Sequence, residues 1–248
     1  MSIKGIVFDF NGTMYIDGDK QEAAWFEFFQ RHADGKYTVR QLHKMIHGIN
    51  GGEFLKMALN PDLTEQEIYD LTEEKEDIYR KMCLNDPKGI NFTEGLPEFL
   101  TKLKEHAVPF AIATASAIGN VRFYMKHMHL THWIPAEHIV YDDGTFKGKP
   151  EPDIYLMAME RIGLCPGECV VFEDADAGIE AARRAGAGKI IAIGPKKDHE
   201  RLLGLPGVTA VIEDFREVGL DLLEIVCQTK KQKTGVPEVS SSRIPVLF

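Results

Sequence analysis

Short apolar runs alternate along most of the chain with longer segments in which apolar residues recur at helical spacing. The short runs are rich in β-branched and aromatic residues and lie at 6–8, 110–113, 169–172 and 189–193. They are apolar on both faces, which is typical of strands buried in a parallel sheet. Helical patterns lie around them, at about 95–106, 117–128, 152–162 and 177–186. The alternation predicts an α/β fold with a Rossmann-like parallel sheet and right-handed crossovers.

One long segment, 18–89, shows only amphipathic helical patterns. Trp25 and Phe29 belong to an apolar face with helical spacing, and Thr64 followed by Glu67 is the sequence of a capping box at the start of a helix. We therefore expect an all-helical cap domain in this segment, inserted into the α/β core directly after the first strand.

The core is expected to combine residues 1–17 with 90–227. Beyond Cys227 the sequence is polar and without periodicity as far as Arg243. A segment of this kind buries too little apolar surface to order itself. Residues 228–248 are therefore predicted to form a flexible C-terminal tail.

The composition narrows the possible partners. The chain has 248 residues, and 29 basic against 38 acidic residues give a formal net charge of −9. No basic face is evident and no apolar stretch reaches the roughly 18 residues of a membrane span, so we expect neither nucleic acid nor a membrane as partner. The four cysteines are few for this length, which favours reduced thiols in a cytoplasmic protein. No obligate protein partner is evident.

A polar cluster follows each of several predicted strands, at the edge of an open α/β sheet where ligands bind. The clusters are Asp9-Phe10-Asn11-Gly12-Thr13, Thr114-Ala115-Ser116, Lys147-Gly148-Lys149-Pro150-Glu151-Pro152 and Glu173-Asp174. The first three also have simple structural interpretations, as a turn, a helix cap and a solvated lysine. The acidic pair is harder to explain in that way, because two carboxylates at the end of a buried strand are costly without a cation or hydrogen-bond donors. Carboxylate oxygens are ligands that suit Mg²⁺.

Together and in this order, the four clusters resemble the four motifs of the haloacid dehalogenase superfamily. The strings Gly148-Lys149-Pro150-Glu151-Pro152 and Phe172-Glu173-Asp174 are similar to those of its β-phosphoglucomutase and phosphoglycolate phosphatase branch, which has a helical cap. The resemblance implies a Mg²⁺-dependent phosphatase that acts on a small phosphorylated metabolite through an aspartyl-phosphate.

The resemblance also assigns roles to single residues. Asp9 would attack phosphorus and bind Mg²⁺, and the backbone carbonyl of Asn11 and the side chains of Glu173 and Asp174 would complete the metal site. The substrate phosphoryl group would be held by Thr114, Ala115, Ser116 and Lys149.

Substrate recognition is assigned to the cap. The loop at 47–52, with Gly48 and Asn50, is the candidate surface, together with Tyr15, Asp17 and Trp25.

Asn11 departs from the pattern of the superfamily's phosphatases, which have an aspartate two residues after the nucleophile. An amide has no proton to exchange near neutral pH, and general acid–base help is worth about 10²–10⁴ in rate. The protein could be a slow or specialised phosphatase for substrates with a good leaving group, or one that uses another acid from the cap. Alternatives are a phosphometabolite-binding pseudoenzyme, natural or substituted, a haloacid dehalogenase, and a phosphomutase. The acidic pair argues against the dehalogenase, and the absence of arginine from the cap loop argues against the phosphomutase.

Overall fold

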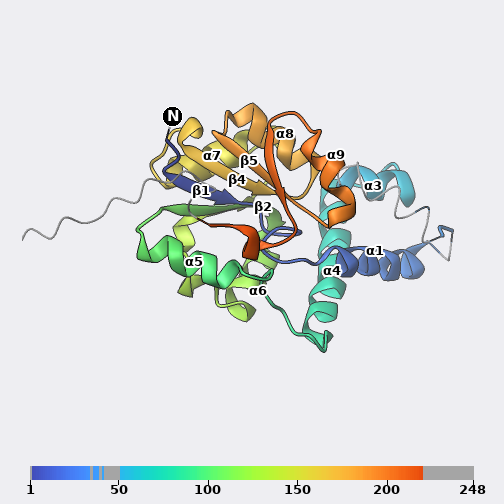
Figure 1. Cartoon of the computed structure of the whole chain (residues 1–248). Helices are drawn as coiled ribbons and strands as arrows, with labels where there is room; N and C mark the ends of the chain where they lie inside the picture. The colour runs from blue at the N-terminus through green and yellow to red at the C-terminus, as the bar shows by residue number, and fades with distance from the viewer. Residues whose placement is uncertain (1, 34–35, 39–40, 42–50, 220–248) are drawn as a thin grey trace, which may run out of the picture.

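A six-stranded parallel sheet forms the centre of the computed structural model, which describes residues 2–33, 36–38, 41 and 51–219 (Figure 1). The strand order is β3-β2-β1-β4-β5-β6, and every described pairing is parallel. The strands are β1 Gly5–Phe8, β2 Phe110–Ala117, β3 Ile139–Asp142, β4 Cys169–Glu173, β5 Lys189–Ile193 and β6 Val208–Ile212. The predicted α/β class is confirmed. The predicted tail at 228–248 lies outside the described residues.

Helices cover both faces of the sheet. Figure 1 shows α5 (Leu96–Glu105) and α6 (Ile118–His127) below it and α7 (Asp153–Arg161) and α8 (Asp176–Ala185) above it. A short helix, α9 (His199–Leu203), packs beside β6. These helices correspond to the predicted ones, except that α9 was not predicted.

Each face of the sheet has its own apolar core, because successive residues of a strand point to opposite faces. On β1, Phe8 belongs to the core on the α5 side and stacks on Phe172 of β4 with ring centroids 5.3 Å apart. The neighbouring Val7 belongs to the other core, together with Val171 and Tyr155. β1 and β4 are buried along their whole length, which explains why their sequences have no polar face.

Strands β3 and β6 were not predicted from the sequence. They are the two edges of the sheet and are only partly buried, so their apolar runs are interrupted by Asp142 and Thr209. Edge strands carry a weaker apolar signal than central ones because one side faces no neighbouring strand.

The end of β2 also differs from the prediction. The strand continues to Ala117, four residues beyond the predicted end, and α6 begins at Ile118. Residues 114–116 therefore lie on the strand and not at a helix start. The N-cap residue of α6 is Ala117, which makes no side-chain cap hydrogen bond. The interpretation of this cluster as a helix cap is wrong.

The segment after β1 contains the helices α1 (Gly18–His32), α3 (Gly51–Ala58) and α4 (Glu65–Asn85), which form the cap. Figure 1 shows them on the side of the core to which β1 leads. The capping box of Thr64 and Glu67 is confirmed at the start of α4. Within the part of the chain that the structure describes, no helix is long and apolar enough to cross a bilayer.

Two linkers join the cap to the core, and they contact each other. In the returning linker, the backbone N–H of Thr93 donates to the carbonyl of Met14 at 2.9 Å, and its hydroxyl donates to the carbonyl of Thr13 at 2.7 Å. An ion pair of 2.8 Å between Lys20 and Asp86 connects the first turn of α1 to the end of α4. The two linkers between the core and the cap are therefore held together by these contacts, next to the loop that follows β1.

Candidate active site

Three of the predicted polar clusters meet where β1, β2 and β4 end. β1 lies between β2 and β4, with Phe8 opposite Ile112 on one side and Phe172 on the other. Asp9 follows β1 directly, and its backbone N–H donates to the carbonyl of Phe172 at 3.0 Å. This register places Asp9 beside Glu173, the last residue of β4.

Three carboxylates and one lysine form a cluster at this edge. Asp9, Glu173 and Asp174 each offer an oxygen within 4.8 Å of the others, and this is the one such acidic group in the described residues that could hold a metal ion. Lys149 comes from the loop before α7, and its Nζ lies 2.5 Å from Asp9 Oδ1 and 2.6 Å from Glu173 Oε1. The hydroxyl of Tyr155 donates to Glu173 Oε1 at 3.0 Å. All four predicted charged residues are brought together.

The cluster has more buried negative charge than positive charge. Asp9 and Glu173 are only 6% and 1% exposed, and among the described residues Lys149 is the one cation that contacts them. Burial raises the pKa of Asp9 to about 7, although the ammonium of Lys149 lowers it. Burial and the charge of Glu173 raise the pKa of Asp174 well above its usual value. Burial lowers the pKa of Lys149, but Asp9 and Glu173 raise it further, so the lysine stays charged.

This donor set fits a hard divalent cation. The ligand atoms on offer are all oxygens, the carboxylates outnumber the lysine, and their charge is not offset in the buried site. Mg²⁺ is usually bound by one or two carboxylates together with other oxygen ligands, and the three carboxylates here can supply them.

Two glycines make room for the carboxylates. Gly12 has a backbone φ of +82°, and a Cβ at this position would lie 2.1 Å from Asp174 Oδ2. A Cβ on Gly178, in the first turn of α8, would lie 1.6 Å from Glu173 Oε1. Any side chain at either position would displace a carboxylate of the cluster. Gly12 stands in the first predicted cluster and Gly178 follows the acidic pair by four residues, but their packing against the carboxylates was not predicted.

The side chain of Asn11 is held by hydrogen bonds on both of its polar atoms. Its Nδ2 donates to Asp17 Oδ2 at 2.8 Å and to the hydroxyl of Tyr124 at 2.8 Å. Its Oδ1 accepts from the hydroxyl of Ser116 at 2.8 Å. Ser116 is thus committed to Asn11, and its backbone N–H donates to Thr114 Oγ1 at 3.1 Å. Sequence reasoning did not predict the contacts of Asn11.

The remaining predicted positions have mixed outcomes. Thr114 is buried on β2, three residues before the end of the strand, whereas the next residue, Ala115, is exposed. Gly48 and Asn50 lie outside the described residues, so their assignment to substrate recognition stays a prediction.

Three further residues of the predicted recognition surface are buried. Trp25 packs inside the cap against Phe29 and Phe54, and Tyr15 and Asp17 are also buried. Their burial does not support the prediction that they belong to a substrate-recognition surface. An aromatic residue with helical spacing packs in the cap's own core in preference to facing solvent.

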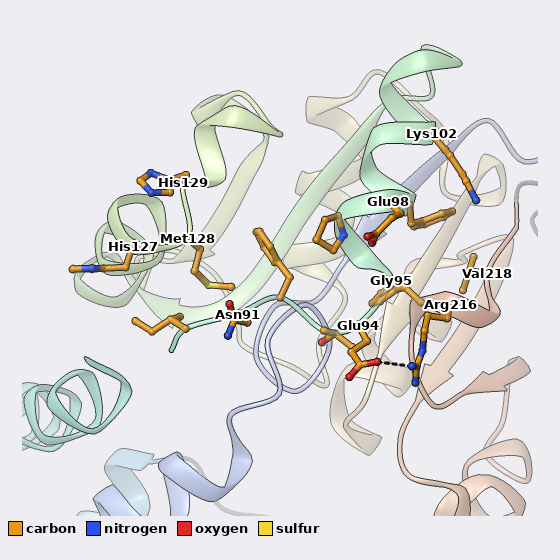
Figure 2. A pocket seen from close by; sticks show the side chains of 16 residues that line it. Asn91, Glu94, Gly95, Glu98, Lys102, His127, Met128, His129, Arg216 and Val218 are labelled. Atoms are coloured by element: carbon orange, nitrogen blue, oxygen red, sulfur yellow. Dashed lines mark ion pairs between the residues drawn. The ribbon is translucent and has the colours of Figure 1, made fainter. Parts of the chain in front are cut away.

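A cavity of about 770 Å³ lies elsewhere, between the returning linker, α5 and the end of α6 (Figure 2). Figure 2 shows Glu94 and Arg216 paired at its rim, at 2.5 Å. None of the residues of the acidic cluster line this cavity. The cavity is large enough for a small ligand. The carboxylates and the lysine that could take part in a reaction lie at the strand ends, so we assign the candidate active site to the strand ends.

Comparisons with known proteins agree with the fold and identify a family. A sequence model described as haloacid dehalogenase-like hydrolase matches residues 3–186. A solved HAD hydrolase of family IA, variant 3, from Entamoeba histolytica HM-1:IMSS is 32% identical, with a TM-score of 0.84 over 90% of this chain and 98% of that one. A phosphorylated carbohydrates phosphatase of Thermotoga maritima is 26% identical over 85% of this chain and 94% of its own length. The fructose-1-phosphate phosphatase YqaB of Escherichia coli K12 is 29% identical, over 73% and 92%.

Proposed function

The chain belongs to the haloacid dehalogenase-like hydrolases, and we propose that it is a phosphatase that releases phosphate from a small phosphorylated metabolite. Phosphorylated sugars are the proposed substrate class, because similar proteins are named as phosphatases of phosphorylated carbohydrates and of fructose 1-phosphate. The observation that carries the proposal is the contact of Lys149 with both Asp9 and Glu173 beside Asp174.

Asp9 is the proposed nucleophile. One of its carboxylate oxygens forms a bond to phosphorus while the bond from phosphorus to the leaving oxygen breaks. Water then attacks the aspartyl-phosphate, which releases inorganic phosphate and restores the carboxylate. A buried carboxylate repels an anionic substrate, and Lys149, 2.5 Å from Asp9, supplies fixed positive charge against that repulsion.

Asp9, Asp174 and the backbone carbonyl of Asn11 are the proposed ligands of Mg²⁺. When bound, the ion would neutralise charge shared between the phosphoryl group and the carboxylates. Glu173 is engaged by Lys149 and Tyr155, so we assign it to holding the lysine and supporting the metal site. Gly12 and Gly178 keep the space that Asp174 and Glu173 occupy.

The phosphoryl oxygens would be held by Lys149 and by the hydroxyl and backbone of Thr114. Ser116 donates to Asn11, so its proposed role is to hold that side chain in place. Ala115 contributes its backbone at the exposed rim of the site.

Asn11 sets the expected range of substrates. It offers no carboxyl group to protonate a leaving oxygen, and that help is worth about 10²–10⁴ in rate. We therefore expect slow hydrolysis of sugar phosphate esters and faster hydrolysis of acetyl phosphate, whose acetate leaves without a proton. The acidic pair Glu173 and Asp174 has no evident task in displacing a halide, which favours the phosphatase over the dehalogenase.

The proposal is tested by phosphate release from acetyl phosphate, p-nitrophenyl phosphate and fructose 1-phosphate in the presence of Mg²⁺. We expect Asp9→Asn to lower kcat by about 10³-fold or more, as loss of a nucleophile does. Asp176→Asn is the matched control, because this exposed aspartate near the same edge pairs with Arg201 and not with the cluster.

Other outcomes would identify the alternatives. Wild-type turnover no higher than that of Asp9→Asn, with phosphate still bound, would indicate a pseudoenzyme. Release of chloride from 2-chloropropionate without metal would indicate a dehalogenase.

A further inference from the structure

Asp17 is a buried carboxylate outside the acidic cluster, and it is surrounded by donors. It is 1% exposed. Its Oδ2 accepts from Asn11 Nδ2 at 2.8 Å, from the hydroxyl of Tyr79 at 2.6 Å and from Gln21 Nε2 at 3.2 Å. Its Oδ1 accepts from the backbone N–H of Gly12 at 3.2 Å.

These donors come from two parts of the molecule. Asn11 and Gly12 belong to the loop that follows β1 and carries Asp9, which we call the nucleophile loop (residues 9–13). Gln21 and Tyr79 belong to cap helices α1 and α4. Asp17 is the N-cap residue of α1, yet its side chain makes no cap hydrogen bond. Its carboxylate is therefore used to connect the cap to the nucleophile loop.

The donor at position 11 must be an amide or another hydrogen-bond donor. An ionised carboxylate only accepts hydrogen bonds, so the NH₂ group of Asn11 faces Asp17 and its carbonyl oxygen faces Ser116. An aspartate at position 11 would place acceptor against acceptor at a separation of about 2.8 Å. Asn11, which departs from the phosphatase pattern, is thus the residue type that can donate a hydrogen bond to the buried Asp17.

The nucleophile loop is tied to the acidic cluster as well. Gly12 lies against Asp174, so close that a Cβ would overlap the carboxylate. A shift of Asn11 or Gly12 would therefore move groups that contact the cluster directly.

We propose that Asp17 is a positioning residue, which requires an amide at position 11 and holds the nucleophile loop in place through Asn11 and Gly12 when the cap is docked. The proposal rests on the proposed function, since the reaction it serves is the one at Asp9. If the proposal holds, Asn11 and Asp17 are a matched pair of donor and acceptor. Substituting both residues, so that the amide and the carboxylate change places, preserves the hydrogen bond, and substituting one of them does not.

The experiment compares the wild type with Asn11→Asp, Asp17→Asn and the double exchange N11D/D17N. Thermal unfolding and the kcat and KM for acetyl phosphate with Mg²⁺ are measured for all four. We expect each single substitution to lower kcat by about 10- to 100-fold, the effect of losing a hydrogen bond to a buried charged group. KM should change less than kcat. The double exchange restores the pair with reversed polarity, so we expect it to exceed both single variants in kcat and in unfolding temperature.

A control pair lies in a second contact between cap and core. The buried Asn120 of α6 donates to Glu76 Oε2 of α4 at 2.7 Å and accepts from Arg80 Nη1 at 2.9 Å, and neither contact involves the nucleophile loop. Asn120→Asp makes the same chemical change opposite a carboxylate, and Glu76→Gln supplies the exchanged partner. We expect Asn120→Asp to lower the unfolding temperature without the loss of kcat seen for Asn11→Asp.

Additive effects would overturn the proposal. If the double exchange is the least stable and least active of the four proteins, residues 11 and 17 are not a matched pair. If Asn120→Asp lowers kcat as much as Asn11→Asp does, the effect belongs to cap docking in general and Asp17 has no special role. Failure of the proposed function has another signature. The wild type would then match Asp9→Asn on every phosphorylated substrate, while the unfolding data would still report the pairing.

Discussion

The acidic cluster at the strand ends and the single buried carboxylate Asp17 both contact Gly12, and their charges are satisfied in opposite ways. At the strand ends, Lys149 contacts Asp9 and Glu173, and Asp174 completes the acidic cluster without an ion pair to this lysine. At the entry to the cap, both oxygens of Asp17 accept hydrogen bonds from neighbouring donors. A buried carboxylate that accepts hydrogen bonds from protein donors stabilises the local structure. Buried carboxylates with too few cations or donors around them indicate a site for a cation or a reacting group.

The largest effect is expected from Lys149→Met. It removes the cation that contacts both Asp9 and Glu173, and breaking a buried ion pair costs about 3–5 kcal/mol. Without Mg²⁺ we expect the free energy of unfolding, measured with urea, to fall by about that amount. With Mg²⁺ present we expect the variant to have lost phosphate release. Mg²⁺ should return part of the lost stability. Equal loss of stability with and without Mg²⁺ would mean that the carboxylates do not form a cation site.

Asp17→Ala gives the contrasting result. It leaves several buried donors without their acceptor, at a cost of about 1–3 kcal/mol in unfolding free energy. Because this group has its own donors, we expect the loss to be the same with Mg²⁺ or with EDTA. A loss that Mg²⁺ reverses would place Asp17 in the metal site and remove the distinction between the two groups.

The smallest effect is expected at an exposed carboxylate. Hydrogen bonds from Arg183 and Arg184 lower the pKa of Glu180 on α8 to about 2. Since the folded pKa lies below the unfolded one of about 4.3, the stability it contributes is present above that value and is lost as pH falls toward 2. Glu180→Gln should therefore lower the unfolding temperature slightly at pH 7 and not at pH 2. An equal decrease in unfolding temperature at pH 7 and at pH 2 would contradict this prediction. Glu217→Gln, on the short 3-10 helix Phe215–Glu217, is a suitable control.

The sequence predicted what depends on local patterns. The apolar runs of β1 and β4 identified the central strands, and the polar residues at their ends identified Asp9, Glu173 and Asp174. Lys149 was found because its motif resembles that of a known family. The edge strands β3 and β6 were missed because partial burial weakens their apolar pattern.

The rest depends on how distant elements pack. Asp17 meets Tyr79 across 62 positions of sequence, and Asn11 meets Tyr124 across 113. No spacing rule links such residues, because their contact is decided by how α4 and α6 approach the nucleophile loop. The burial of Trp25 was missed for a similar reason, since an amphipathic pattern does not say which apolar side chains face the interior of the cap.

The position of β1 in the strand order has a consequence for how this chain can change. Asp9 follows β1, the third of the six strands in the order of the sheet. β1 pairs with β2, which carries Thr114, and with β4, which ends at Glu173. An insertion beside β6 is separated from Asp9 by β4 and β5, whereas the segment that follows β3 carries Lys149. We therefore expect the β6 margin to accept insertions without a change in the geometry around Asp9, and the β3 margin to accept them less readily.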